Sequence, residues 1–253
     1  SAVPFLRGLE EAAAAAAGGA VRAHLVGSRL YGVALPGSDA DVLLELSAAA
    51  RRSLARPADE ALAPRDAARL TSSRALLALR RHLESEQGRG PLEVVGMVLD
   101  AKVPTLRARW PPGASTGGPV EVEVSFDQSL ASLLKSELLA RCAQTDARAL
   151  QLALLLRLWA AARGVDGQQR GYPSGYGFCL MAVFYCQCQG MIGGLVPRTR
   201  EALSAFAPSA PEAAESWRPI GGVVVPAPGA DVTALLPGLF AFYSREFRWQ
   251  SEV

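Results

Sequence analysis

Alternating apolar and polar residues predict a β-sheet in the first half of the chain. The clearest alternation covers residues 120–126, where Glu121, Glu123 and Ser125 lie between apolar residues. Successive side chains of a strand point to opposite faces, so this segment predicts a strand with one buried face. Shorter apolar segments at residues 21–26, 38–46, 92–99 and 103–110 also predict strands.

Helical spacing of apolar residues dominates the second half. Over residues 146–163, leucines and Trp159 recur at three- and four-residue intervals. This spacing predicts a helix with Trp159 and the leucines in the core. The apolar residues 178–185 are expected in the core as well. Further helices are predicted at residues 4–20, 29–35, 67–83, 130–143, 178–189, 198–206 and 232–247.

The change from strand to helix after Phe126 predicts two domains. Residues 1–128 are expected to form a domain with a mixed β-sheet, and residues 129–253 a helical domain. The N-terminal helix can pack on either of them. Sheet and helices in separate regions of the chain predict the α+β fold class.

The composition excludes several classes of protein. Of the 253 residues, 50% are hydrophobic and 20% are charged, which excludes disordered and fibrous chains. A net charge of +2 does not by itself indicate nucleic-acid binding. Lys102 and Lys135 are the only lysines, so the positive charge is mostly arginine, which suits bidentate contacts to phosphate. No apolar run approaches the roughly 20 residues that cross a bilayer, so no membrane segment is expected.

The cysteines and histidines do not form a metal-binding pattern. Cys142, Cys179, Cys186 and Cys188 lack paired zinc-ligand spacing. They are expected to be buried free thiols, which favours a reducing, intracellular setting. His24 and His82 are isolated in sequence, so each is interpreted as a structural or surface residue.

The residues with the strongest chemical pattern lie between Gly27 and Val42. Gly27-Ser28 follows a predicted strand and can offer backbone N–H groups and a hydroxyl to a phosphate. Asp39 and Asp41 are two residues apart in the next predicted strand, so both carboxylates face one side. Two adjacent carboxylates suit a hard divalent cation such as Mg²⁺.

A third acidic ligand is usual where two metal ions hold the attacking and leaving oxygens of a phosphoryl transfer. Glu123 is the candidate, with Glu121 as the weaker choice. Each piece alone also fits a polar turn or a solvated strand face. The ordered combination favours phosphoryl transfer, because the chain lacks a Walker A motif, a paired-histidine zinc motif and a serine nucleophile elbow.

The segment from Gly27 to Val42 resembles the motif of the DNA polymerase beta-like nucleotidyltransferase superfamily. Downstream segments are similar to terminal uridylyltransferases and noncanonical poly(A) polymerases within it. These segments are Val124-Ser125-Phe126, Thr145-Asp146-Ala147-Arg148, Leu158-Trp159-Ala160, Ser174-Gly175-Tyr176-Gly177, Leu180-Met181 and residues 239–247. The resemblance implies a nucleotidyltransferase domain and a helical domain, with the active site in the cleft between them.

The resemblance also implies roles for residues of the first domain. Gly27 and Ser28, with Ser38, would hold the nucleotide triphosphate. Asp39 and Asp41 would bind Mg²⁺, or Mn²⁺ in its place. Glu123 falls where the family has a third aspartate, so the carboxylate is moved by one methylene group.

The resemblance also implies that residues of the second domain bind the nucleotide. Tyr176 falls on a tyrosine that stacks on the base, with Ser174 beside it. Lys135 and Ser136 stand where the family has residues that reach the ribose and base. Arg157 replaces a lysine that contacts the triphosphate. The family's second lysine is Ala161 here, and no compensating residue is evident.

The sequence thus predicts a uridylyltransferase that adds UMP from UTP to the 3′ end of single-stranded RNA. A poly(A) polymerase that uses ATP, a catalytically silent RNA-binding subunit and a nucleotide-binding module for small molecules stay as alternatives. The small size of the chain is compatible with action in an RNA-processing complex. The resemblance favours the mitochondrion, and the cytoplasm stays open.

Overall fold

The structure is a computed structural model. It describes residues 3–85, 92–110, 119–126, 131–192 and 232–247. The chain divides into two compact units. The first, called the sheet unit, comprises Ser1–Gly27 and Gly37–Leu133. The second, called the helical unit, comprises Ser28–Pro36 and Leu134–Val253.

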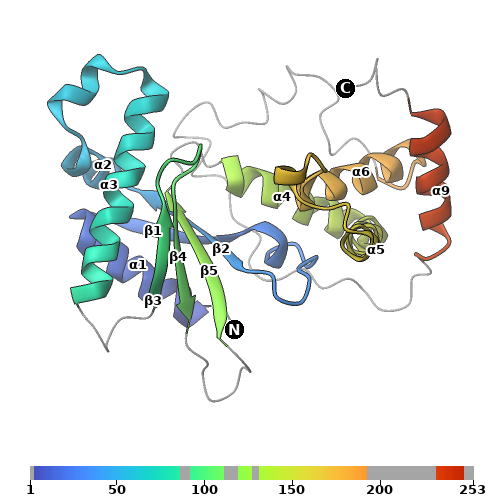
Figure 1. Ribbon diagram of the computed structural model, residues 1–253, viewed down its shortest axis with the longest axis horizontal. Helices are drawn as coiled ribbons and strands as arrows, with labels where there is room; N and C mark the ends of the chain where they lie inside the picture. Colours follow the sequence, from blue (N-terminus) through green and yellow to red (C-terminus); the bar gives the residue numbers. More distant parts are fainter. Residues whose placement is uncertain (1–2, 86–91, 111–118, 127–130, 193–231, 248–253) are drawn as a thin grey trace. The chain divides into compact units, whose positions relative to one another are not determined.

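The sheet unit contains one five-stranded sheet with the strand order β1-β2-β5-β4-β3 (Figure 1). Only β2 and β5 run parallel, and the other neighbours are antiparallel. The sheet is therefore mixed, and the predicted α+β class is confirmed. The strands are β1 (Val21–Val26), β2 (Ala40–Leu46), β3 (Glu93–Val98), β4 (Thr105–Trp110) and β5 (Val120–Phe126).

Two helices, α1 (Val3–Ala17) and α3 (Pro64–Ser85), pack against the apolar face of this sheet. Their buried residues, such as Leu9 and Leu76, form one core with Val124 of β5 and its neighbours. The alternation predicted for residues 120–126 is confirmed, because every second side chain is buried. The opposite sheet face therefore carries the charged side chains of β5.

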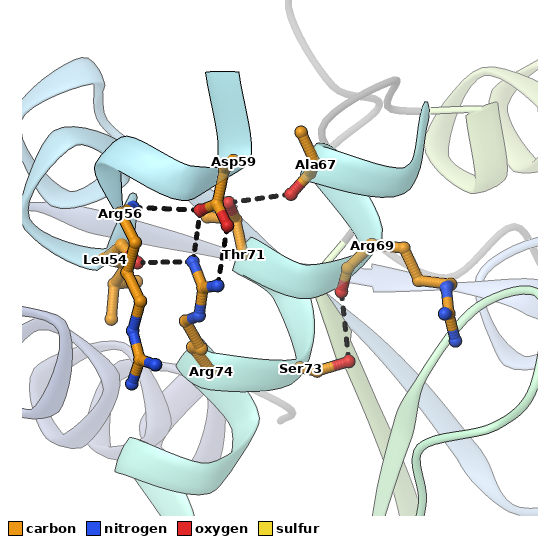
Figure 2. Close-up of polar contacts among 8 residues, drawn as sticks. All are labelled: Leu54, Arg56, Asp59, Ala67, Arg69, Thr71, Ser73 and Arg74. Carbon is orange, nitrogen blue, oxygen red and sulfur yellow. Dashed lines mark hydrogen bonds and ion pairs between the residues drawn. The ribbon is translucent and has the colours of Figure 1, made fainter. Parts of the chain in front are cut away.

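The connection between α2 (Ala48–Leu54) and α3 is fixed by one arginine (Figure 2). The Arg74 guanidinium of α3 forms a bidentate ion pair with the Asp59 carboxylate and also donates to the Leu54 carbonyl. The Arg56 backbone N–H donates to the same carboxylate at 2.9 Å. These hydrogen bonds stabilise the charged carboxylate and lower the pKa of Asp59 to about 2.

The helical unit is built around α5 (Ala147–Arg163) and α6 (Gly175–Cys188), with α4 (Ala131–Thr145) and α9 (Leu235–Ala241). Helix α9 continues into a π-helical turn, Phe242–Glu246. Buried side chains from the segment Ser28–Pro36 also belong to this core, namely Leu30, Tyr31 and Val33. The segment after Gly27 therefore packs with the helices and not with the sheet.

Several sequence predictions of local structure were wrong. Residues 29–35 do not form the predicted helix, because Gly32 adopts a φ of 78°. Helix α6 begins at Gly175, earlier than predicted, because the Ser174 hydroxyl caps it. Helix α2 was not predicted, and the helix predicted at residues 198–206 lies outside the described residues.

The expected burial of Trp159 was also wrong. Trp159 is 37% exposed and packs on Phe240, with the ring centroids 4.7 Å apart. Leu158 and Phe184 are exposed as well. All three lie on helix faces that no described segment covers completely, whereas the other predicted core positions of α5 and α6 are largely buried.

The interpretation of the cysteines as free thiols is confirmed for all four residues. Burial raises the pKa of Cys142 and of Cys186 to about 11, and that of Cys179 to about 12. Cys188 differs because its side chain is exposed. Buried thiols with raised pKa values stay protonated near neutral pH and act as small core side chains.

No helix among residues the structure describes is long and apolar enough to cross a membrane.

Candidate active site

Two of the predicted acidic residues lie side by side on the charged face of the sheet unit. Asp41 of β2 and Glu123 of β5 are direct partners in the parallel register. Neighbouring strands lie about 4.8 Å apart, so the two carboxylates share one small region. Asp39 precedes β2 and is not part of the strand, in contrast to the prediction.

The surroundings of Glu123 disfavour its charged form. Burial raises the pKa of the Glu123 carboxyl, and the negative charge of Asp39 raises it further, while Arg107 opposes both effects. Asp39 is therefore close enough to Glu123 to interact with it electrostatically. A group of acidic side chains that repel one another is expected where a cation is to be bound.

Gly27 makes room for the Asp41 carboxylate. Its φ is 72°, in the left-handed region that favours glycine. A Cβ atom at this position would lie 2.1 Å from Oδ2 of Asp41. The bare backbone of Gly27 and the Asp41 carboxylate are therefore in direct contact, which links the glycine of the predicted phosphate site to one predicted metal ligand.

Cross-strand pairs distinguish Glu123 from Glu121. Arg109 lies 3.0 Å from the Glu121 carboxylate and 3.7 Å from the Glu93 carboxylate. The corresponding contact between Arg107 and Glu123 is longer, at 3.8 Å. Glu121 is thus the acidic residue that its arginine neutralises more fully, which favours Glu123 as the functional one. Sequence reasoning missed both arginines, although the alternation of β4 places them on the polar face.

The carboxylates fit a divalent cation by their chemistry. Asp39, Asp41 and Glu123 offer only oxygen donors, which Mg²⁺ prefers. The pKa of Glu123 is raised chiefly by burial and further by the charge of Asp39. Across the described part of the chain, no group of three or more His, Cys, Asp or Glu side chains is arranged to hold a metal ion. The third ligand therefore stays a prediction.

The helical unit brings the predicted base-binding residues together. The Ser174 hydroxyl accepts a hydrogen bond from the Gly177 N–H at 3.1 Å and so caps α6. The cap places Tyr176 in the first turn, where burial raises the pKa of its hydroxyl to about 12. Nζ of Lys135 lies 5.8 Å from the centre of the Tyr176 ring. Ser136, next to Lys135, is buried.

Arg157 contacts the segment that contains Ser28. Its guanidinium donates a hydrogen bond to the Val33 carbonyl. The Val33 N–H in turn donates to the Ser28 carbonyl at 3.0 Å. All these residues belong to the helical unit. Ser38, by contrast, belongs to the sheet unit and is half-buried just before Asp39.

The fold is shared with solved nucleotidyltransferase structures. Terminal uridylyl transferase 4 from Trypanosoma brucei with bound dUTP matches 98% of this chain and 70% of its own, with a TM-score of 0.69 and 20% identity. The GLD-2/RNP-8 complex matches 98% and 78%, with a TM-score of 0.65 and 18% identity. The Cid1 poly(U) polymerase bound to MgGTP matches 97% and 68%, with a TM-score of 0.61 and 20% identity.

The sequence comparisons support the resemblance less strongly than the structural ones. No family model matches the chain. Caffeine-induced protein 16 from Schizosaccharomyces pombe is 33% identical over 68 residues, which are 27% of this chain and 6% of that protein. The structural likenesses confirm the expected resemblance at the level of the fold. The chain therefore has the nucleotidyltransferase fold that terminal uridylyl transferases also have.

Proposed function

We propose that the chain is a nucleotidyltransferase that acts on RNA 3′ ends and transfers UMP from UTP. The observation that carries the proposal is the register of Asp41 and Glu123, with Gly27 against Asp41, on the fold of the uridylyl transferases. Adjacent carboxylates beside a bare glycine backbone are suited to hold a cation next to a phosphate.

Asp39, Asp41 and Glu123 would hold Mg²⁺, or Mn²⁺ in its place. The bound metal would supply charge stabilisation to the attacking RNA hydroxyl and to the leaving pyrophosphate. Gly27 leaves the space in which the Asp41 carboxylate lies. Its backbone is proposed to bind the triphosphate. Ser28 and Ser38 are proposed to contribute hydroxyl groups to the same triphosphate.

Tyr176 is proposed to stack on the base, and Lys135 with Ser136 to reach the ribose and base. Stacking is worth about 1–3 kcal/mol per base and tolerates any base. Solved forms of the Trypanosoma brucei transferase hold UTP, CTP or GTP. UTP is proposed here because Cid1, which has the same fold, is described as selective for UTP.

The test is extension of a short single-stranded RNA by the purified chain with Mg²⁺ and each nucleoside triphosphate separately. The expected result is extension with UTP, lost in Asp39→Ala. Extension with ATP alone would show that the chain is a poly(A) polymerase and not a uridylyltransferase. A small-molecule transferase would be indicated by turnover that does not need RNA.

A silent subunit is the second candidate, because Glu123 has Arg107 as an ion-pair partner and its carboxylate is partly neutralised without a metal. In this case UTP binds, but no nucleotide extends RNA at any Mg²⁺ concentration. The GLD-2/RNP-8 complex shows that a protein of this fold assembles with a partner. A partner protein is therefore proposed for RNA delivery, and the compartment stays a prediction.

A further inference from the structure

Arg157 joins two nucleotide-binding segments of the helical unit that are far apart in sequence. On one side its guanidinium donates to the Val33 carbonyl, within the segment Ser28–Pro36. On the other side the same guanidinium lies against Gly175, at the first residue of α6. One side chain therefore contacts both the segment that begins with Ser28 and the turn that carries Ser174 and Tyr176.

The lack of a side chain at Gly175 allows this close approach of Arg157. A Cβ atom at Gly175 would lie 3.1 Å from Nε and 3.2 Å from Nη2 of Arg157. These distances are tighter than ordinary contacts, so an added Cβ atom would require the guanidinium to shift by a few tenths of an ångström. The close approach of Arg157 thus explains why a glycine stands between Ser174 and Tyr176.

The segment on the Val33 side packs on the helical core and is closed by a backbone hydrogen bond. Leu30, Tyr31 and Val33 are buried in the helical core. The hydrogen bond from the Val33 N–H closes the turn back to the Ser28 carbonyl. The hydrogen bond from the Arg157 guanidinium to the Val33 carbonyl therefore restrains the segment that begins with Ser28.

Stability alone does not explain an arginine at this place. No ion pair of Arg157 is seen among the residues that the structure describes. A cation beside the first turn of a helix is unfavourable, because the helix dipole is positive there. The negative charge of a bound nucleotide would lower this cost, also without direct contact to the guanidinium.

We infer that Arg157 is a positioning residue, which holds Ser28 and Tyr176 in register for one nucleotide and acts through Val33 and Gly175. The inference rests on the proposed function, in which Ser28 holds the triphosphate and Tyr176 the base. It differs from the sequence prediction, in which Arg157 contacts the triphosphate directly. The clamp, by which we mean the contacts of Arg157 with Val33 and Gly175, requires a planar guanidinium that meets both partners at once. Lysine cannot supply these contacts, but it can still bind a phosphate as a point charge.

The first arm of the test uses the nucleotide-free protein. Hydrogen–deuterium exchange is measured at residues 28–36 in the wild type, Arg157→Ala, Gly175→Ala and the control Arg163→Ala, which removes an exposed arginine from the same helix. Loss of a charged hydrogen bond is expected to speed exchange of the Val33 amide about tenfold. The increase is expected in Arg157→Ala and in Gly175→Ala, which keeps the charge, and not in the control. Unchanged exchange in both variants would overturn the clamp.

The second arm measures UTP affinity and steady-state transfer. We expect the KM for UTP to rise about tenfold in Arg157→Ala and Gly175→Ala with little change in kcat. Arg157→Lys is expected to behave like Arg157→Ala. If lysine restores UTP affinity and Gly175→Ala has no effect, Arg157 is a phosphate ligand and the positioning role is overturned.

The two arms separate the inference from the proposed function. Suppose that exchange is faster in the variants, but the wild-type protein neither binds UTP nor extends RNA. This result would disprove the proposed function and the nucleotide-positioning role of Arg157. The contacts of Arg157 with Val33 and Gly175 would still be supported. Thermal melting of each variant identifies one that has failed to fold, and Gly175→Ala keeps the test valid if Arg157→Ala is such a variant.

Discussion

The sheet unit and the helical unit carry opposite chemistry. The candidate residues of the sheet unit are chiefly acidic, and Asp41 and Glu123 sit on rigid neighbouring strands. Those of the helical unit are basic, hydroxylic or aromatic. Lys135 near the start of α4 lies over the ring of Tyr176 in the first turn of α6. We therefore propose that the sheet unit serves the chemical step and that the helical unit serves binding of the base and ribose. Variants in the two units are then expected to change kcat and KM separately.

The units also differ in how an arginine holds a loop. Arg74 of the sheet unit has its charge balanced by Asp59 and holds the α2–α3 connection (Figure 2). Arg157 of the helical unit holds Val33 through a neutral carbonyl. The first contact is complete without any ligand and is therefore expected to serve stability. The second is made to a neutral partner, and we propose that it holds Ser28 and Tyr176 in register for a nucleotide.

The largest effect on the sheet-unit side is expected for Gly27→Ala. The new Cβ atom would lie 2.1 Å from the Asp41 carboxylate oxygen, at a φ that disfavours alanine. Transfer should fall by roughly a hundredfold or more, because displacing one charge-stabilising group costs about that much. Gly96→Ala is the matched control, since nothing lies within 4 Å of its Cβ position. Equal activity of the two variants, measured by RNA extension, would contradict the placement of Asp41.

A paired comparison of Glu123→Gln with Glu121→Gln sharpens the choice of the third carboxylate. Glu123→Gln is expected to lower kcat by about tenfold to a hundredfold and to raise the Mg²⁺ concentration needed for half-maximal rate. Glu121→Gln should have little effect, because its exposed ion pair with Arg109 is worth at most about 1 kcal/mol. The reverse ranking would move the third ligand to Glu121.

On the helical side, Tyr176→Ala is expected to weaken UTP binding roughly tenfold, since stacking contributes about 1–3 kcal/mol. Its kcat at saturating UTP should change little. Tyr176→Phe should retain binding, because the ring remains. Tyr172→Ala is the control, since Tyr172 is an exposed tyrosine a few residues earlier. A Tyr176→Ala protein with normal KM would break the assignment of base binding to this unit.

The smallest expected effect concerns stability, and it depends on pH. The pKa of Asp59 is lowered to about 2 in the folded chain, so its ion pair stabilises the fold above the ordinary carboxyl pKa near 4. This stabilisation is lost as the pH falls from about 4 to about 2. Asp59→Asn should lower the melting temperature by on the order of a few degrees at pH 6 and by less at pH 2 to 3. A difference that does not depend on pH would contradict the charged pair.

The strands and the acidic residues could be predicted from the sequence because their signals are local. Period-two alternation identified β5 and placed Glu123 on its polar face. The strand predicted at residues 38–46 corresponds to β2, although Asp39 lies just before it. The cross-strand partners could not be predicted in this way. Arg107 meets Glu123 only because β4 pairs with β5, and register is set by the whole sheet.

The helical unit was harder to predict for the same physical reason. Its helices were recognised from apolar spacing, but the exposure of Trp159 depends on which neighbours cover each face. The contact of Arg157 with Val33 joins positions more than a hundred residues apart. Gly175 was recognised in the sequence as part of a motif. Its contact with the Arg157 guanidinium could be found only from the structure.

The most direct measurement of the central claim compares UTP binding with UMP transfer in Asp41→Asn and Tyr176→Ala. Asp41→Asn should bind UTP with nearly wild-type affinity and lose transfer by about a thousandfold, since metal stabilisation is worth several kcal/mol and about 1.4 kcal/mol is tenfold. Tyr176→Ala should show the opposite pattern, with weak binding and a normal saturated rate. Wild-type transfer by Asp41→Asn would contradict the claim that the carboxylates of the sheet unit perform the chemistry.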